Sequence, residues 1–450
     1  MLELKRIHWV AVLSCSLVMV CEGFDLVVYG NTIPLLINDA AIGMSIGNAG
    51  NIGSLAFLGM FVGGLAAGKI NQSFTPRAII LAGTAAFSVA VFATGLATEM
   101  LSIALLRLAL GVGLGVVLPT SLSLARSASG QRFAPLVVSV TMAGIPAGGT
   151  LASVTVALMG DGASWRAAFI VAGIIGLVIM LAALKGLRRD DIRSCKNLRL
   201  SERSEETKGK SAGQRQMGYR SSRHQAGIKR TFTQPDISAA REPGDPKPWT
   251  ETFSGSGRWL LIFFALATFA DLFSYYGVST WLTQLMREFD LPMSSSLHLT
   301  TALNLGAIGG SLASSLLAVK LGSRTIALFC GILAACCLIG ISLHQKSPFV
   351  LGFLVVMTGA TSISAQNLLN TLVSNAFSPP MRSGALGFTL GLGRLGAVFA
   401  PTVGGCVLEF GFGAEAVLGC FAGASIVGCA ALLVASALTS RLSLGVRPEL

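Results

Sequence analysis

The sequence predicts an all-α membrane protein with twelve transmembrane helices in two six-helix pseudo-symmetric halves. Hydrophobic residues make up 52% of the 450 residues and charged residues only 12%, against about 25% charged residues in soluble domains. The stretch 188–257 alone holds 15 of the 33 Lys and Arg and 9 of the 21 Asp and Glu. The rest of the chain is therefore poor in charge, and it contains six long apolar runs on each side of that stretch.

Each apolar run is continuous and long enough to cross a bilayer as a helix, which takes about 20 residues. Membrane β-strands would instead alternate apolar and polar residues over about ten positions. The first run follows Lys5 and Arg6, carries Glu22 and Asp25, and is not followed by a cleavage site and a soluble domain. It is therefore predicted to be a span rather than a signal peptide. The runs lie at 9–37, 48–70, 77–97, 101–124, 133–158, 165–187, 258–282, 298–320, 324–344, 348–376, 384–408 and 415–440.

The chain divides into three parts. Residues 1–187 form an N-terminal six-helix half, and residues 258–450 form a C-terminal six-helix half. Residues 188–257 are rich in Arg, Lys, Ser, Gly, Gln and Pro without apolar periodicity. This composition predicts a disordered cytoplasmic linker, whose basic charge favours contact with anionic membrane lipids. The net charge of +12 then reflects Lys and Arg kept on the cytoplasmic side, and no nucleic-acid partner is expected.

The basic residues also predict the orientation of the spans. With both termini in the cytoplasm, the outer loops hold only Arg166, Arg287 and Lys346. This bias follows the positive-inside rule and fits an even number of spans. The cytoplasmic side holds the linker together with Lys5, Arg6, Lys69, Arg77, Arg126, Arg132, Lys320, Arg324, Arg382, Arg441 and Arg447.

The two halves share a small basic turn at matching places. Lys69 and Arg77 lie between the second and third runs, and Lys320 and Arg324 lie between the eighth and ninth. Repeated halves of this kind are typical of secondary transporters whose binding site lies between them. We expect Arg77 and Arg324 to take part in gating.

Other classes of function are disfavoured. Most of the nine Cys lie inside apolar runs, and neither they nor the four His show the spacing of a zinc site. No metal and no other cofactor is expected. No nucleophile–base pair is evident at membrane depth, so the chain is not predicted to be an enzyme.

Two carboxylates lie in the first run, where a charge costs about 2.5–3.5 kcal/mol by insertion scales. Glu22 and Asp25 are three residues apart, so they share roughly one helix face. Two neighbouring carboxylates in a low dielectric do not both stay ionised, which predicts a proton site. The alternative is a structural pair satisfied by hydrogen bonds or by a basic partner. Gly23 allows a flexible or closely packed point between them.

Two arginines lie in glycine-rich runs. Arg107 in the fourth run must find an anionic or carbonyl partner, and Glu22 or Asp25 is our candidate. The alternative is a static pair between helices. Arg394 in the eleventh run suits bidentate capture of a substrate carboxylate, unless it pairs with Asp271 or another buried acid.

The seventh and tenth runs carry further candidates for substrate binding. Asp271 and Tyr275 are four residues apart and face one way, and with Tyr276 they suggest an aromatic wall for an aromatic ligand. Aromatic residues near a helix end are also ordinary membrane-interface anchors. Gln366 and Asn367 are candidates for polar contacts with a ligand, although such amides often serve only to join helices.

The fifth run contains Gly144, Pro146 and Gly148 within six residues. It is not a phosphate-binding loop, because it lacks the GK[ST] ending and follows no strand. The pattern predicts a kink and a tight helix contact.

These motifs resemble those of the major facilitator superfamily, and within it the aromatic acid:proton symporter family that includes benzoate and 4-hydroxybenzoate transporters. The stretch Glu22 to Gly30 is similar to the family's first-span Asp-Gly-x-Asp motif, with Glu22 in place of the first Asp. Arg107 and its glycines resemble the fourth-span arginine motif, and 144–149 is similar to the fifth-span Gly-Pro motif. The stretch from 382 to 401 matches the eleventh-span pattern, whereas the turns at 68–77 and 320–324 lack the family's usual acid.

The resemblance implies the major facilitator fold and the uptake of a small aromatic carboxylate, such as a benzoate-type acid, together with protons. The expected setting is a bacterial inner membrane, with a monomer that works by alternating access. An anion that enters the cell is opposed by about 2.3 kcal/mol per charge per 100 mV, and co-transport of more than one proton would reverse that opposition.

Two alternatives remain open. One is a proton-coupled exporter of drugs or metabolites, because the fifth-span motif is more often associated with antiporters. The other is a non-transporting membrane sensor that signals through the linker.

Overall fold

The computed structural model describes residues 8–128, 134–160, 164–187, 255–343, 347–377 and 379–445. Twelve helices in these ranges are long and apolar enough to cross a membrane, which confirms the predicted fold class. Most of the predicted linker, 188–254, lies outside the described residues. Its last three residues, 255–257, form the first turn of a helix instead.

Side chains cap the starts of some helices in the N-terminal half. Ser45 accepts a hydrogen bond from the Asn48 backbone N–H, and Thr75 accepts one from that of Ala78. Such caps satisfy backbone donors that have no partner inside the helix, so the second span begins before its apolar run. The helices are α1 (Trp9–Ile37), α2 (Ile46–Ser73), α3 (Pro76–Leu96), α4 (Met100–Ser127), α5 (Ala134–Met142), α6 (Gly144–Leu158) and α7 (Trp165–Gly186).

The helices of the C-terminal half include the longest in the described chain, α10, which extends six residues beyond the predicted end at residue 282. These extra residues are largely polar, so apolar length alone did not predict them. The helices are α10 (Gly255–Glu288), α11 (Met293–Leu321), α12 (Ser323–Ser342), α13 (Pro348–Ala376), α14 (Pro379–Glu409) and α15 (Gly413–Gly445).

The fifth span is made of two helices, α5 and α6, which meet at Ala143. Pro146 lies buried in the first turn of α6. A proline has no N–H to donate to the carbonyl four residues earlier, and its ring crowds that carbonyl. The break therefore lies where the proline disturbs the backbone ladder.

At several glycines, helices approach one another closely because no side chain lies between them. A Cβ at Gly23 on α1 would meet the Ile145 carbonyl of α6, and one at Gly148 on α6 would meet the Val20 carbonyl of α1. Gly111 on α4 packs in the same way against the Ala56 carbonyl of α2. Small residues of this kind let membrane helices gain van der Waals contact in the absence of a hydrophobic driving force.

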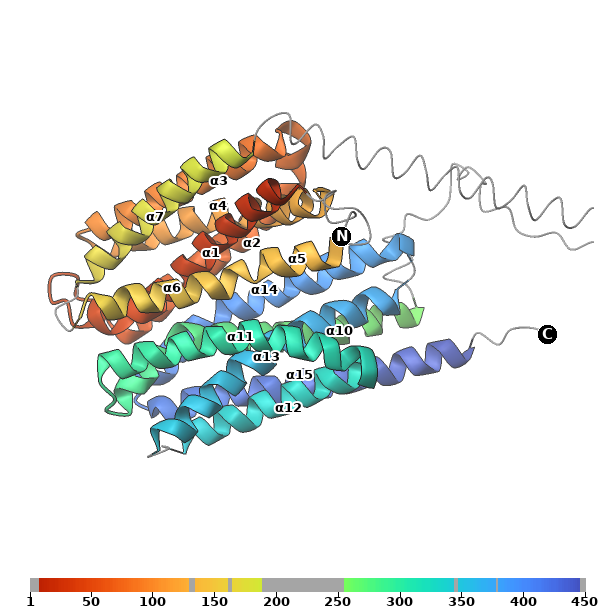
Figure 1. The fold of residues 1–450 in the computed structure, drawn as a ribbon. Coiled ribbons are helices and arrows are strands. Elements are labelled where there is room, and N and C mark those ends of the chain that lie inside the picture. The colour runs from red at the N-terminus through yellow and green to blue at the C-terminus, as the bar shows by residue number, and fades with distance from the viewer. Residues whose placement is uncertain are drawn as a thin grey trace, which may run out of the picture.

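The two halves of the bundle lie side by side (Figure 1). We name the ends of the bundle after one residue at each. The Asp39 end holds the end of α1 and the start of α2, and the Arg77 end holds the start of α1 and the end of α15 (Figure 1). Contact between the halves is made by α1 with α10, α2 with α14 and α6 with α11.

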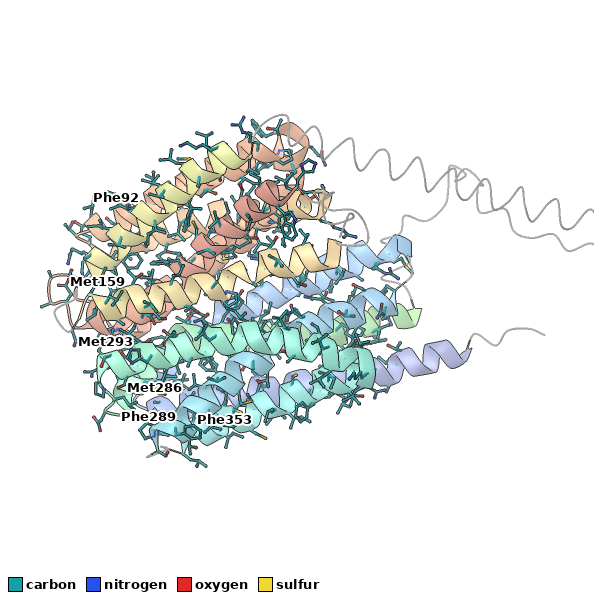
Figure 2. The ribbon with its side chains drawn as sticks, viewed as in Figure 1. Phe92, Met159, Met286, Phe289, Met293 and Phe353 are labelled. Carbon is teal, nitrogen blue, oxygen red and sulfur yellow. The ribbon has the colours of Figure 1, made fainter. Side chains whose placement is uncertain are left out.

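Contacts between the halves gather toward the Asp39 end. The Thr283 hydroxyl donates to Asn31 Oδ1 at 2.8 Å, and the Ser54 and Thr402 hydroxyls lie 2.8 Å apart. We call these four residues the seam. Apolar side chains pack around it, among them Met159, Met286, Phe289 and Met293, which gather at this end in Figure 2. The Asp39 end is therefore closed.

The glycine contacts predict that two Gly→Ala substitutions differ in their effect on the stability of the protein. Gly111→Ala should destabilise the protein by about 1–3 kcal/mol, because overpacking forces the backbones of α2 and α4 apart. Gly352→Ala on α13 should be neutral or stabilising by up to about 1 kcal/mol, because a Cβ there meets nothing within 4 Å. Thermal unfolding in detergent measures both variants, and equal effects would contradict the packing argument.

Candidate functional site

Both carboxylates predicted in the first span lie buried near the middle of α1. Glu22 is 1% exposed and Asp25 is fully buried. The two side chains differ in what surrounds them, since Asp25 contacts its own half and Glu22 faces a charge from the other half.

Asp25 forms a buried ion pair with Arg107 of α4. Nη1 of Arg107 donates to both carboxylate oxygens of Asp25, at 2.9 Å and 2.8 Å. The guanidinium also lies over the ring of Tyr29, 4.3 Å from its centre, in a cation–π arrangement. The Tyr29 hydroxyl in turn donates to the Ala49 carbonyl of α2 at 2.6 Å. Three helices of one half thus share this charged centre.

Glu22 has no such partner. Neither of its carboxylate oxygens takes part in a hydrogen bond with any described residue. The charge that acts on it most strongly is the guanidinium of Arg394, on α14 of the opposite half. Arg394 and Glu22 both act electrostatically on Tyr276 of α10 as well. These three residues therefore bring an acid, a cation and an aromatic ring together at the junction of the halves.

Aromatic rings surround this junction. Tyr276 lies 4.9 Å from Phe57 of α2, measured between ring centroids, and 5.2 Å from Tyr275. The sequence did not point to Phe57, because nothing distinguishes it from other apolar residues of a glycine-rich span. Tyr29 was also missed, although its position four residues after Asp25 placed it on the same helix face.

Asp271 lies apart from this cluster. Its Oδ2 atom is buried without a hydrogen-bond partner among the described residues, and its charge acts on the thiols of Cys330 on α12 and Cys429 on α15. It thus faces the interior of the C-terminal half. The structure does not bring it into an ion pair with Arg394.

The two amides predicted in the tenth span differ in their surroundings. Gln366 is buried and donates to Asn370 Oδ1 at 3.2 Å, while its own Oε1 lacks a partner among the described residues. Asn367 is exposed and donates to the Ser311 hydroxyl of α11 at 3.0 Å. Asn367 therefore joins two helices of one half.

The residues expected in gating lie at the Arg77 end. Nη2 of Arg77 donates to the Leu184 carbonyl at 3.3 Å, so it joins the start of α3 to the last turn of α7. Arg324 is exposed in the first turn of α12. Both lie outside the central cluster.

Hydrogen-bonding side chains that the sequence did not indicate continue the seam into each half. Asn31 Nδ2 donates to the Ser153 hydroxyl at 3.0 Å, and the Thr283 and Thr300 hydroxyls lie 3.0 Å apart. The chain Ser153–Asn31–Thr283–Thr300 thus crosses α6, α1, α10 and α11. Within the described ranges, no group of three or more His, Cys, Asp or Glu is placed to hold a metal ion.

The buried pair of Asp25 and Arg107 predicts a large loss of stability when one partner is removed. Arg107→Gln leaves the Asp25 carboxylate buried without its counter-charge, which costs about 3–5 kcal/mol. Arg166→Gln is the matched control, because Arg166 also pairs with an aspartate, Asp39, but both side chains are partly exposed. Thermal denaturation in detergent should show a clearly smaller loss for Arg166→Gln, and similar losses would refute the argument from burial.

Curated relatives of this chain are transporters. The chain is 26% identical to the benzoate transport protein of Acinetobacter baylyi, over 90% of this chain and 85% of that protein. It is 26% identical to the gentisate transporter of Corynebacterium glutamicum, over 94% and 86%. It is also 26% identical to the 3-(3-hydroxy-phenyl)propionate transporter of Escherichia coli, over 95% and 94%.

Solved structures show the same fold. A crystal structure of a D-xylose–proton symporter matches with a TM-score of 0.70 at 14% identity, and the match covers 95% of this chain and 97% of that one. The xylose transporter of E. coli in an inward-open conformation matches with a TM-score of 0.67 at 13% identity, covering 96% and 95%. The family model of the Major Facilitator Superfamily matches residues 15–401. The chain therefore belongs to the Major Facilitator Superfamily and is a transporter rather than an enzyme.

Proposed function

We propose that this transporter imports an aromatic carboxylate of the benzoate type together with protons. The observation that carries the proposal is the buried Glu22 carboxyl, which lacks a hydrogen-bond partner and lies within the electrostatic reach of Arg394 beside Tyr276. A cation, an ionisable acid and aromatic rings are the groups that a transporter of an aromatic acid and a proton needs. The relatives named above support this substrate class, since each is described as a transporter of an aromatic carboxylate.

Charge balance at the junction gives a reason for the coupling. Arg394 supplies one positive charge, and the Glu22 carboxylate and a substrate carboxylate would compete for it. Two anions beside one cation in a low dielectric repel each other strongly. We therefore infer that Glu22 takes up a proton when the substrate carboxylate binds Arg394, and that it returns to the ionised form when the substrate leaves.

The remaining predicted residues would support this exchange. Asp25 and Arg107 hold α1 against α4 with their charges balanced, so that Glu22 keeps its place on α1. Tyr275, Tyr276 and Phe57 would provide the faces against which an aromatic ring packs. Gln366 has a free buried acceptor and would serve a polar substituent on that ring.

We also propose an orientation. The Arg77 end faces the cytoplasm of a bacterial cell, with both termini on that side of the inner membrane, since it carries most of the basic residues outside the linker. The closed Asp39 end then faces outward. Transport by a monomer would follow from rocking one half against the other, so that the Asp39 end opens while the Arg77 end closes.

Proton-coupled export is the second candidate. It is favoured by the break between α5 and α6 beside Pro146, because this Gly-Pro stretch resembles a motif more often associated with antiporters. Uptake of labelled aromatic and aliphatic acids into proteoliposomes, with and without a proton uncoupler, separates the two. An importer accumulates benzoate when the outside is acidified, whereas an antiporter extrudes its substrate under the same gradient.

Glu22→Gln should uncouple transport from protons, because the amide cannot exchange one. We expect acid-driven accumulation of benzoate to be lost while exchange of labelled for unlabelled benzoate persists. The matched control is Glu99→Gln, which makes the same chemical change at an exposed position before α4. Normal acid-driven accumulation by the Glu22 variant would remove it from the proton pathway.

Arg394→Lys should weaken substrate binding while retaining the positive charge. A lysine loses the planar fork that holds a carboxylate with two hydrogen bonds, and loss of about 1.4 kcal/mol lowers affinity about tenfold. The apparent KM for benzoate uptake measures this effect. An unchanged KM would mean that Arg394 does not hold the carboxylate.

A further inference from the structure

A pocket of about 320 Å³ opens at the Asp39 end, between the two halves. We call it the Arg287 pocket. Its walls come from both halves. The N-terminal half supplies the end of α1 and part of α6, with Pro34, Leu35, Asn38 and Val156. The C-terminal half supplies Arg287 from the last turn of α10 and Met293 from the first turn of α11. Asn31 and Thr283 of the seam lie about one helical turn deeper on α1 and α10. The pocket therefore lies next to Asn31 and Thr283 of the seam, on the side that faces the Asp39 end.

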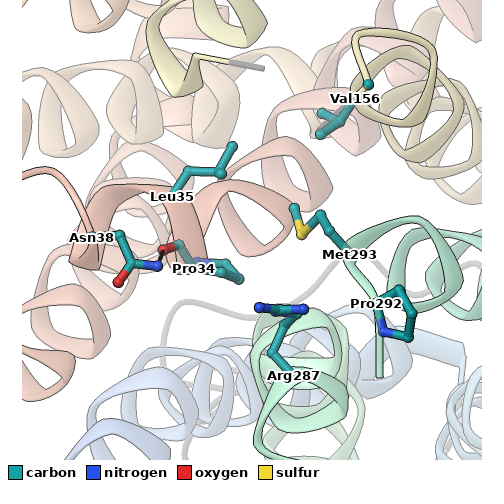
Figure 3. A pocket seen from close by; sticks show the side chains of 8 residues that line it. Pro34, Leu35, Asn38, Val156, Arg287, Pro292 and Met293 are labelled. Atoms are coloured by element: carbon teal, nitrogen blue, oxygen red, sulfur yellow. Dashed lines mark hydrogen bonds between the residues drawn. The ribbon is translucent and has the colours of Figure 1, made fainter. Parts of the chain in front are cut away.

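The pocket combines one cation with an apolar lining. Figure 3 shows the Arg287 guanidinium directed into the space between Pro34 and Met293. Arg287 is exposed, and its Nη1 donates to the Leu291 carbonyl at 3.0 Å, which leaves the other N–H groups for a ligand. Leu35, Val156 and Met293 supply apolar surface, and a methionine sulfur packs favourably against an aromatic ring.

Two acidic residues near the pocket, Asp39 and Glu288, are engaged elsewhere. Asp39 follows Asn38 in the chain, but its Oδ2 accepts hydrogen bonds from Trp165 and Arg166, both at 2.7 Å. These two hydrogen bonds hold the pKa of the Asp39 carboxyl below its ordinary value, so it stays ionised and remains paired with Arg166. Glu288 accepts a hydrogen bond from Gln284 at 2.8 Å. Asp290, three residues after Arg287, is exposed, and no carboxylate among the described residues forms an ion pair with Arg287. The pocket therefore retains the positive charge of Arg287.

We propose that the Arg287 pocket binds a second aromatic carboxylate, and that this binding holds the Asp39 end closed. The guanidinium matches the carboxylate, and the apolar lining matches the ring. This inference rests on the proposed function, since it takes the same substrate class to a second site on the outer side.

The closing effect follows from the position of the walls. If the halves separate at the Asp39 end, the α1 and α6 walls move away from Arg287 and Met293, and the pocket ceases to exist. A ligand that binds only the closed form shifts the population toward that form. External substrate at high concentration should therefore inhibit its own uptake.

Equilibrium binding of radiolabelled benzoate to the purified full-length protein tests the second site. We expect two bound benzoates in the unmodified protein, one in Arg287→Gln, one in Arg394→Gln and none in the double variant. Arg258→Gln is the matched control, because it removes one exposed positive charge from the other end of the same helix, and it should bind two. Benzamide, which lacks the charge, and acetate, which lacks the ring, should fail to displace benzoate from the Arg287 pocket. Displacement by either would overturn the assigned ligand class.

The outcomes separate this inference from the proposed function. If Arg394→Gln binds one benzoate fewer than the unmodified protein and Arg287→Gln binds the same number, the assignment of the Arg287 pocket is wrong. The proposed function would still stand. If only Arg287→Gln binds one benzoate fewer, the result would support the Arg287 pocket. It would also count against substrate binding at Arg394. No saturable binding in the unmodified protein would overturn both.

Uptake kinetics in proteoliposomes test the closing effect. The unmodified protein should show a rate that falls at high external benzoate, whereas Arg287→Gln should reach a plateau with an unchanged apparent KM at low concentration. Arg258→Gln should behave as the unmodified protein does. Two bound benzoates without any fall in the uptake rate would overturn the closing effect.

Discussion

The ion pair of Arg107 and Asp25 is the interaction on which the arrangement of the site depends. A charge at membrane depth is costly without a partner, and the partner of Arg107 lies on a different helix. The guanidinium packs on Tyr29, whose hydroxyl reaches the backbone of α2. The pair therefore fixes α1 relative to α2 and α4, and with α1 it fixes the place of Glu22.

The second constraint is that the site belongs to neither half alone. Glu22 comes from the N-terminal half and Arg394 from the C-terminal half, and the ring of Phe57 meets that of Tyr276 across the same junction. A ligand placed there would contact both halves. The charge of the ligand would then affect the relative position of the two halves as well as the binding affinity.

Much of this architecture was predictable from the sequence, because hydrophobic length alone identifies spans. The pairing of Arg107 with an acid of the first span also followed from the cost of a lone charge. Asp271 shows the limit of this reasoning. The free-energy cost of a charge in the membrane indicates that a buried acid has a role, but it does not indicate which helices the acid faces. The Arg287 pocket and the Asn31–Thr283 bond were not predictable at all, because residues 252 positions apart meet only once the halves have docked.

The chemistry of the seam has a consequence for how the closed end would respond to its surroundings. Asn31, Thr283, Ser54 and Thr402 join the halves through neutral hydroxyls and an amide, and each such bond contributes about 0.5–1.5 kcal/mol net because water replaces it when it breaks. Screening by dissolved ions weakens attractions between charges and leaves neutral hydrogen bonds largely unaffected. The contribution of the seam to the balance between closed and open forms at the Asp39 end should therefore be nearly independent of ionic strength, in contrast to any contribution from an anion bound by the exposed Arg287.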